Sequence, residues 1–144
     1  MKKKLKSDFV LIGFLLFFII FLIFLYINFE RDKVIDKRVI YAKVLVGDKY
    51  GFDINGTALT FGMITPGGSS STREIELTNK YNRDVEVEIY SDGNIKDFLI
   101  ISQDNFILRR NESIKIKFTV SVPLECEFGT YEGNVKVLIK RINN

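Results

Sequence analysis

One uninterrupted apolar segment, Phe9–Ile27, constrains this chain more than any other feature. Its 19 residues include no charged side chain. A helix of that length covers about 28 Å, close to the hydrocarbon thickness of a bilayer. A helix at the surface of a soluble protein keeps a polar face, which this segment lacks. A cleaved signal peptide is the alternative, but no small-residue cleavage site precedes Glu30. We expect an uncleaved transmembrane helix over residues 9–29.

Charge is distributed unevenly around this segment. Four of the 21 Lys and Arg residues and one of the 18 Asp and Glu residues precede it, so the remaining 17 of each sign cancel. A neutral C-terminal part gives no concentrated basic face, so we expect no nucleic-acid partner. The short lysine-rich tail, residues 1–8, favours a cytoplasmic N-terminus and an extracytoplasmic C-terminal part. The expected location is the cell membrane, with lipid contacting residues 9–29.

The composition removes most enzyme classes. The chain has no His and one Cys, so it has no imidazole ligand, no Ser-His-Asp triad and no internal disulfide. Cys126 lies between two glutamates, which disfavour a reactive thiolate. Gly67-Gly68 lacks the lysine of a phosphate-binding loop, and the loop aspartates lack EF-hand spacing. We expect no enzyme activity, no cofactor and no metal site, with calcium binding by loop carboxylates left open.

The rest of the chain alternates between apolar and polar residues with a period of two. Such short runs, separated by turn residues, predict half-buried antiparallel strands. The runs cover residues 39–46, 57–64, 73–79, 84–90, 97–101, 113–122 and 131–140. The expected fold is all-β: an immunoglobulin-like antiparallel β-sandwich of about seven strands over residues 39–144. Residues 30–38 would form a charged stalk between this domain and the helix.

Several turn and strand motifs resemble those of hydin-type (ASH) and major-sperm-protein-like Ig domains, which occur in cell-surface proteins, archaeal ones included. The resemblance covers about residues 57–140 and implies a fold rather than a catalytic site. Its motifs are Phe61-Gly62, Pro66-Gly67-Gly68-Ser69, Ile75-x-Leu77-x-Asn79, Asn111-Glu112-Ser113, Phe118-Thr119-Val120-x-Val122-Pro123 and Gly129-Thr130-Tyr131-x-Gly133-x-Val135-x-Val137.

Charge alternation also predicts which strands are neighbours. Residues 73–79 and 84–90 carry glutamates on their polar face, whereas residues 113–122 and 131–140 carry lysines. Opposite charges that face each other on neighbouring strands attract. We therefore expect 73–79 to pair with 113–122, and 84–90 to pair with 131–140, in separate sheets. Tyr131 is expected to act as a corner tyrosine, whose hydroxyl binds the backbone.

Two kinds of candidate site remain. Asn55 and Asn111 begin possible N-glycosylation sequons, although Asn-Gly at 55 is also common hairpin chemistry. The strand over residues 39–46 is expected at a sheet edge, where Tyr41, Lys43 and Leu45 would meet a partner by backbone pairing. A partner, a second copy or the chain's own final strand could cover it.

These expectations define a function by binding. The chain would display a non-catalytic, single-pass, membrane-anchored Ig-like module that binds a protein or an envelope layer. One alternative is a structural accessory subunit of a surface machine, such as an archaellum stator or a pilus. A second is a non-catalytic subunit of a membrane enzyme complex. The sequence does not determine the oligomeric state or the partner.

Overall fold

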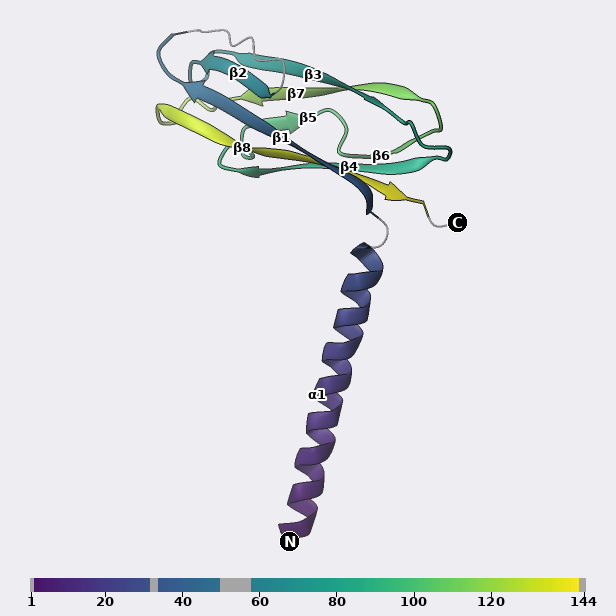
Figure 1. The fold of residues 1–144 in the computed structure, drawn as a ribbon. Coiled ribbons are helices and arrows are strands. Elements are labelled where there is room, and N and C mark those ends of the chain that lie inside the picture. Colours follow the sequence, from purple (N-terminus) through teal and green to yellow (C-terminus); the bar gives the residue numbers. More distant parts are fainter. Residues whose placement is uncertain (1, 32–33, 50–57, 143–144) are drawn as a thin grey trace. The chain divides into compact units, whose positions relative to one another are not determined.

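The computed structural model describes residues 2–31, 34–49 and 58–142, and within the helix it describes the side chains of residues 12–27. The chain divides into two compact units, Met1–Val34 and Ile35–Asn144. The first unit holds a single helix and the second holds a β-sandwich (Figure 1). The expected mostly-β fold with one N-terminal helix is confirmed at this level.

The helix α1 extends over Lys2–Arg31 and continues past the apolar segment at both ends. Every described side chain from Ile12 to Ile27 is exposed. Among the side chains that are described, no helix is long and apolar enough to qualify as a membrane span.

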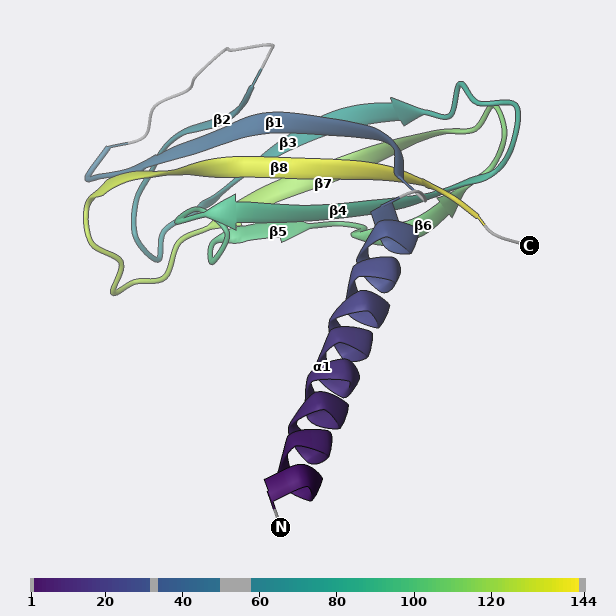
Figure 2. The same ribbon diagram turned by 60° about the horizontal axis from the view of Figure 1, so that its bottom comes forward.

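In the described part of the chain, eight strands form two sheets, and hydrogen bonding gives the order of the strands in each sheet (Figures 1 and 2). The larger sheet has the order β2-β1-β8-β4-β6, and the smaller has the order β3-β7-β5. The strands are β1 Val34–Val46, β2 Leu59–Ile64, β3 Ser70–Thr78, β4 Val85–Gly93, β5 Leu99–Ile101, β6 Asn105–Leu108, β7 Ser113–Ser121 and β8 Gly129–Arg141.

The two expected strand pairings are confirmed. Strand β3 pairs antiparallel with β7, which places Glu74 opposite Lys117. Strand β4 pairs antiparallel with β8, which places Glu86 opposite Lys140. The two pairs lie in different sheets. Opposite charges on facing residues favour this register, and like charges would disfavour a shifted one. The alternating charges in the sequence therefore predicted which strands pair.

Three expectations about the strands are corrected. Strand β1 begins at Val34, so Val34–Arg38 belong to the sheet and not to a stalk. Strand β2 is parallel to β1, so the sandwich is not wholly antiparallel. Parallel neighbours need a crossover of roughly a dozen residues, and the chain between Val46 and Leu59 provides that length. Strand β6 is the third difference, because residues 105–108 were not expected to form a strand.

The core lies between the two sheets and is almost entirely aliphatic. Its central members are the inward residues of the alternating strands, as period-two patterning requires. The fully buried side chains include Ala42, Val44, Val87, Val135, Ile116, Phe118 and Val120. Two polar residues, Thr60 and Asn79, are also buried.

Two glycines allow β4 and β8 to approach closely at one end. Gly93 pairs with Gly133, and Gly93 has a left-handed φ of 80°. A Cβ added at Gly133 would lie 1.9 Å from the carbonyl oxygen of Asp92, which is closer than any real contact. The backbone there therefore requires glycine at position 133.

Candidate binding surfaces

Strand β1 was expected to be an edge strand with a binding surface at Tyr41, Lys43 and Leu45, but it lies inside the larger sheet. Strand β1 lies between β2 and β8, and Ala42–Val46 faces β2 directly. Tyr41 and Lys43 are exposed and Leu45 is half-buried. The chain's own final strand, β8, covers one side of β1, which was one of the three occupants considered. This pairing was not predicted from the sequence, because the neighbours of the first strand depend on the position of the final strand in the sheet.

Tyr41 faces outward and bonds to the neighbouring strand. Its hydroxyl donates a hydrogen bond to the carboxylate of Glu132. This hydrogen bond to an anion raises the pKa of Tyr41 above its usual value. The bond ties β1 to the start of β8 and leaves Tyr41 in its neutral form at neutral pH.

Ion pairs hold two lysines of β8 on the larger sheet. The Lys136 ammonium lies 2.5 Å from the Asp92 carboxylate and 5.6 Å from the centre of the Tyr90 ring. The Asp92 hydrogen bond raises the pKa of Lys136, and the Lys136 hydrogen bond lowers the pKa of Asp92. Lys140 pairs with Glu88 in the same sheet. The charges of these two lysines are therefore neutralised by neighbouring carboxylates.

Asn111 lies in a tight turn that is closed by a backbone hydrogen bond. The N–H of Glu112 donates to the carbonyl of Arg109 at 3.0 Å, which closes a four-residue turn. Asn111 has φ of 61°, and asparagine tolerates this left-handed conformation better than most residues. Its side chain is exposed, so a glycan at this sequon stays a prediction. The other sequon, at Asn55, lies outside the described residues.

Asn79 organises the same end of the sandwich from inside. Its side-chain amide donates to the carbonyls of Arg83, Leu108 and Arg109 at 2.8, 3.0 and 3.0 Å. Its Oδ1 accepts a hydrogen bond from the N–H of Tyr81 at 2.9 Å. One buried side chain thus joins the loop after β3 to the end of β6, which fixes the shape of both loops.

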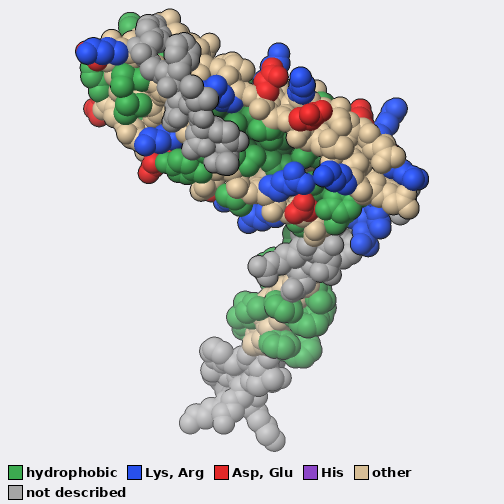
Figure 3. Space-filling model, turned by 45° about the horizontal axis from the view of Figure 1, so that its top comes forward, with side chains coloured by type: hydrophobic (Ala, Val, Ile, Leu, Met, Phe, Trp, Pro, Cys, Tyr) green, Lys and Arg blue, Asp and Glu red, His purple; other side chains and the backbone are tan. Residues whose placement is uncertain are grey.

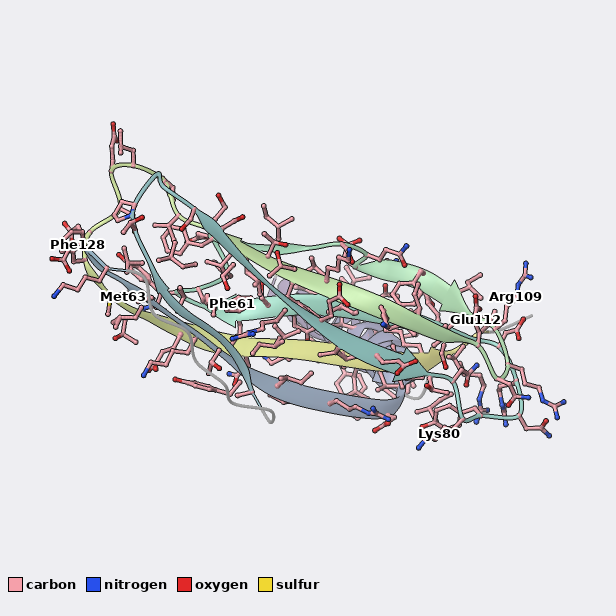
Figure 4. The ribbon with its side chains drawn as sticks, turned by 90° about the horizontal axis from the view of Figure 1, so that it is seen from above. Phe61, Met63, Lys80, Arg109, Glu112 and Phe128 are labelled. Carbon is pink, nitrogen blue, oxygen red and sulfur yellow. The ribbon has the colours of Figure 1, made fainter. Side chains whose placement is uncertain are left out.

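The loops around Asn79 form a basic end of the sandwich. We call this surface the basic end and define it by five exposed cations: Lys80, Arg83, Arg109, Arg110 and Arg141. Residue pairings place them together, because Val85 lies opposite both Leu108 and Arg141. Figure 4 shows Lys80 and Arg109 at this end, and Figure 3 shows blue side chains gathered toward one end of the sandwich.

The two loops that carry four of these cations hold two carboxylates, Asp84 and Glu112, and the backbone binds both. The Asp84 carboxylate accepts from the N–H of Arg110 at 2.8 Å, and the Glu112 carboxylate accepts from the N–H of Arg109 at 2.8 Å. Within the described chain, none of the five cations forms an ion pair. The neutral sum of the C-terminal part therefore hides a local excess of positive charge, which the sequence total could not reveal.

The opposite end of the sandwich is acidic and apolar. The loop between β7 and β8 carries Glu125 and Glu127, and we call Leu124–Phe128 the distal tip. Leu124 is 78% exposed and Phe128 is 67% exposed. Figure 4 places Phe128 and Met63 at the end opposite Lys80 and Arg109. The N–H of Gly67 donates to the carbonyl of Val122 at 3.0 Å, which anchors the base of this loop.

Tyr131 fixes the other side of the distal tip, as the corner-tyrosine prediction required. Its hydroxyl donates to the carbonyl of Glu127 at 3.0 Å, and its ring meets Phe98 edge-on at 4.9 Å between centroids. The Cys126 thiol donates to the same hydroxyl at 3.3 Å. This hydrogen bond raises the pKa of Tyr131. Cys126 is half-buried in a structural contact rather than displayed as a nucleophile.

Comparison with protein-family models, with curated proteins and with solved structures finds no match for this chain. In the described part of the chain, no group of three or more acidic or Cys side chains is placed to hold a metal ion.

Proposed function

We propose that this chain is a single-pass membrane protein that presents a β-sandwich outside the cytoplasm for binding, without catalysis. The observation that carries the proposal is the contrast between the two units. The helix has exposed apolar side chains throughout Ile12–Ile27, whereas the sandwich buries its apolar residues in a core of its own. An apolar surface of that extent needs a cover, and a bilayer supplies one.

The membrane anchor rests on the full apolar run in the sequence. Phe9, Val10 and Leu11 complete this run but lie outside the described side chains. Counted from Phe9 to Ile27, its length suits a bilayer. A spanning helix also satisfies all of its backbone hydrogen bonds internally, which a membrane interior demands.

The Ig-like identity of the sandwich is part of the same proposal. Three features support it: the β3–β7 pairing, the corner hydrogen bond of Tyr131 and the buried Asn79 within the resemblance motif. The parallel β1–β2 pair and the division into sheets of five and three strands depart from the simple Ig arrangement. We interpret the domain as a hydin-type or major-sperm-protein-like relative with a modified first strand.

The distal tip is the surface that best fits a protein partner. Two large apolar side chains, Leu124 and Phe128, stand exposed on one short loop beside two glutamates. The loop is held by Gly67 at its base and by Tyr131 at its side, so little order is lost on binding. A partner with an apolar pocket bordered by basic residues would complement it.

The anchor is tested by alkaline carbonate extraction of membranes from cells that express the full chain. A spanning chain stays in the pellet, and a variant lacking residues 1–31 is released. Release of the full chain into the supernatant would contradict the anchor, provided that a known integral protein stays in the pellet.

The distal tip is tested by crosslinking in native membranes followed by mass spectrometry. The double variant Leu124→Ser, Phe128→Ser should lose the crosslinked partner. Ile100→Ser with Ile107→Ser is the matched control, because these side chains are 59% and 61% exposed on other strands. Equal crosslinking by both double variants would rule out the distal tip as the binding surface.

A further inference from the structure

We infer that the basic end of the sandwich binds the anionic headgroups of the membrane that holds the helix. This inference rests on the proposed membrane anchor and goes beyond it, because it assigns a lipid-binding surface to the β-sandwich itself.

The first argument is that the charge of the basic end is available. Three lysines on the sheet faces are paired: Lys117 with Glu74 at 3.6 Å, Lys136 with Asp92 at 2.5 Å, and Lys140 with Glu88. The five cations of the basic end have no such partner among the described residues, and the two nearby carboxylates accept hydrogen bonds from the backbone. On the two loops and at Arg141, five cations against two carboxylates leave an excess of three positive charges, and at the start of β1 Asp36 is paired with Arg38.

The second argument is that the cations stand on a preorganised surface. The Asn79 amide bonds the carbonyls of Arg83, Leu108 and Arg109, so both loops share one buried support. The turn at Arg109–Glu112 is closed by its own hydrogen bond. Binding a charged surface then requires ordering of side chains but not of backbone.

The third argument is the place of the basic end in the chain. Strands β1 and β2 run parallel and end together at Val46 and Ile64, and the loop after Ile64 bonds to Val122 at the end of the sandwich opposite Leu108. Strand β1 therefore begins at the basic end (Figure 2). Two residues, 32 and 33, separate α1 from β1 in the sequence. Along the chain, the basic end is therefore the end of the sandwich that follows the helix most closely.

Charge across the sandwich supports the same orientation. The loops at the opposite end, 47–49, 65–69, 94–98 and 122–128, hold four carboxylates and two lysines. An anionic surface would attract the basic end and repel the acidic one. Binding at the basic end turns the distal tip away from the lipid, where a protein partner can reach it.

The test uses the full chain in lipid vesicles and a single tryptophan as the reporter. The chain has no Trp, so Asn82→Trp at the basic end gives an unambiguous signal, and Phe128→Trp reports from the distal tip. Quenching by lipids labelled at the headgroup measures proximity to the membrane. Vesicles of neutral phosphatidylcholine are compared with vesicles in which about 30% of the lipid is anionic phosphatidylglycerol.

We expect the tryptophan fluorescence of the Asn82→Trp variant to be quenched at least about threefold more in anionic than in neutral vesicles, and high salt to remove the difference. Replacing Lys80, Arg83, Arg109 and Arg110 by Gln should lower the ratio of lipid-bound to unbound β-sandwich by more than about tenfold. Each cation near an anionic surface contributes about fivefold in affinity. The control replaces Lys43, Lys49, Lys96 and Lys117 by Gln, which changes the net charge equally at positions outside the basic end. The Phe128→Trp variant should stay unquenched in both vesicles.

Flotation of the same vesicles distinguishes a failure of the membrane anchor from a failure of the lipid-binding site. A chain that fails to float contradicts the anchor and with it the lipid site. A chain that floats but shows equal quenching in neutral and anionic vesicles, unchanged by the four basic-end substitutions, overturns the lipid site alone. Crosslinks from Lys80 to an acidic protein, with quenching independent of lipid charge, would assign the basic end to a protein and also overturn the inference. Circular dichroism checks that each variant is folded.

Discussion

Glu74 on β3 and Lys117 on β7 lie directly opposite each other, with the carboxylate oxygen 3.6 Å from the ammonium nitrogen. The next outward pair along the same strands, Glu76 and Lys115, has the same order of charge. A slip of one residue would turn the buried Leu77 outward, so apolar burial and charge favour one register together. On the outer face of the smaller sheet, the glutamates of β3 thus lie opposite the lysines of β7.

The Glu74–Lys117 pair should contribute to register more than to stability. Both side chains are largely exposed, so a double-mutant cycle with Glu74→Gln and Lys117→Gln should give a coupling free energy below about 0.5 kcal/mol. The coupling should shrink further at about 1 M salt, where screening acts within about 3 Å. Urea denaturation of the four proteins measures it. A salt-independent coupling of several times this size would contradict the account.

Asn79→Ala should be strongly destabilising. It removes an amide whose two N–H groups serve three backbone carbonyls, together with one accepted hydrogen bond, at a site that is 2% exposed, and it leaves backbone groups without a partner. We expect a loss of about 3 kcal/mol in the free energy of unfolding, measured by urea denaturation. Asn105→Ala, at an exposed position on β6, is the control and should change stability by less than about 0.5 kcal/mol. Similar losses for both variants would remove the special role of Asn79.

Gly133→Ala should destabilise the pairing of β4 with β8. Its added Cβ would meet the carbonyl of Asp92 at 1.9 Å, so the two strands must separate locally. We expect a cost of about 2–3 kcal/mol, seen as a lower midpoint of thermal unfolding. Gly129→Ala is the matched control, because no atom lies within 4 Å of its added Cβ. An equal unfolding midpoint for both variants would contradict the close approach of β4 to β8 at Gly133.

Asp92 should give the sandwich a component of acid sensitivity. Hydrogen bonds from Lys136 and Asn134 lower its pKa in the folded state below the ordinary value of 3.8. A lowered folded-state pKa stabilises the fold above the unfolded pKa, and this stabilisation is lost as the pH falls through the folded value. NMR titration of the carboxyl group measures it. Lys136→Met should move the Asp92 pKa upward, and no movement would contradict the pairing.

Much of the sandwich could be predicted because alternation reports burial directly. Ile114, Ile116 and Phe118 turn inward on β7 as their spacing requires, and the glutamates and lysines indicated the neighbouring strands. Strand β6 was missed because Asn105–Leu108 is too short to display a period. The parallel β1–β2 pair was missed because a crossover connection leaves no local sign in either strand.

The basic end could not be predicted from local sequence for a similar reason. Lys80 with Arg83, and Arg109 with Arg110, each look like ordinary turn residues. Their proximity depends on β4 pairing with both β6 and β8, a long-range property. The charges of the C-terminal part also sum to zero, so the total hides the separation between cations at the basic end and carboxylates at the opposite end of the sandwich. The signal that could have been used is the clustering of cations in turns that follow β3 and β6.

Cysteine accessibility in intact cells tests the central claim most directly. In the background Cys126→Ser, one variant places a cysteine at Glu125 in the distal tip and another places it at Ser7 in the N-terminal tail. A membrane-impermeant maleimide should label the cysteine at 125 in intact cells, and the cysteine at 7 only after the membrane is permeabilised. Labelling at 7 but not at 125 in intact cells, with the chain in the membrane fraction, would contradict an extracytoplasmic β-sandwich.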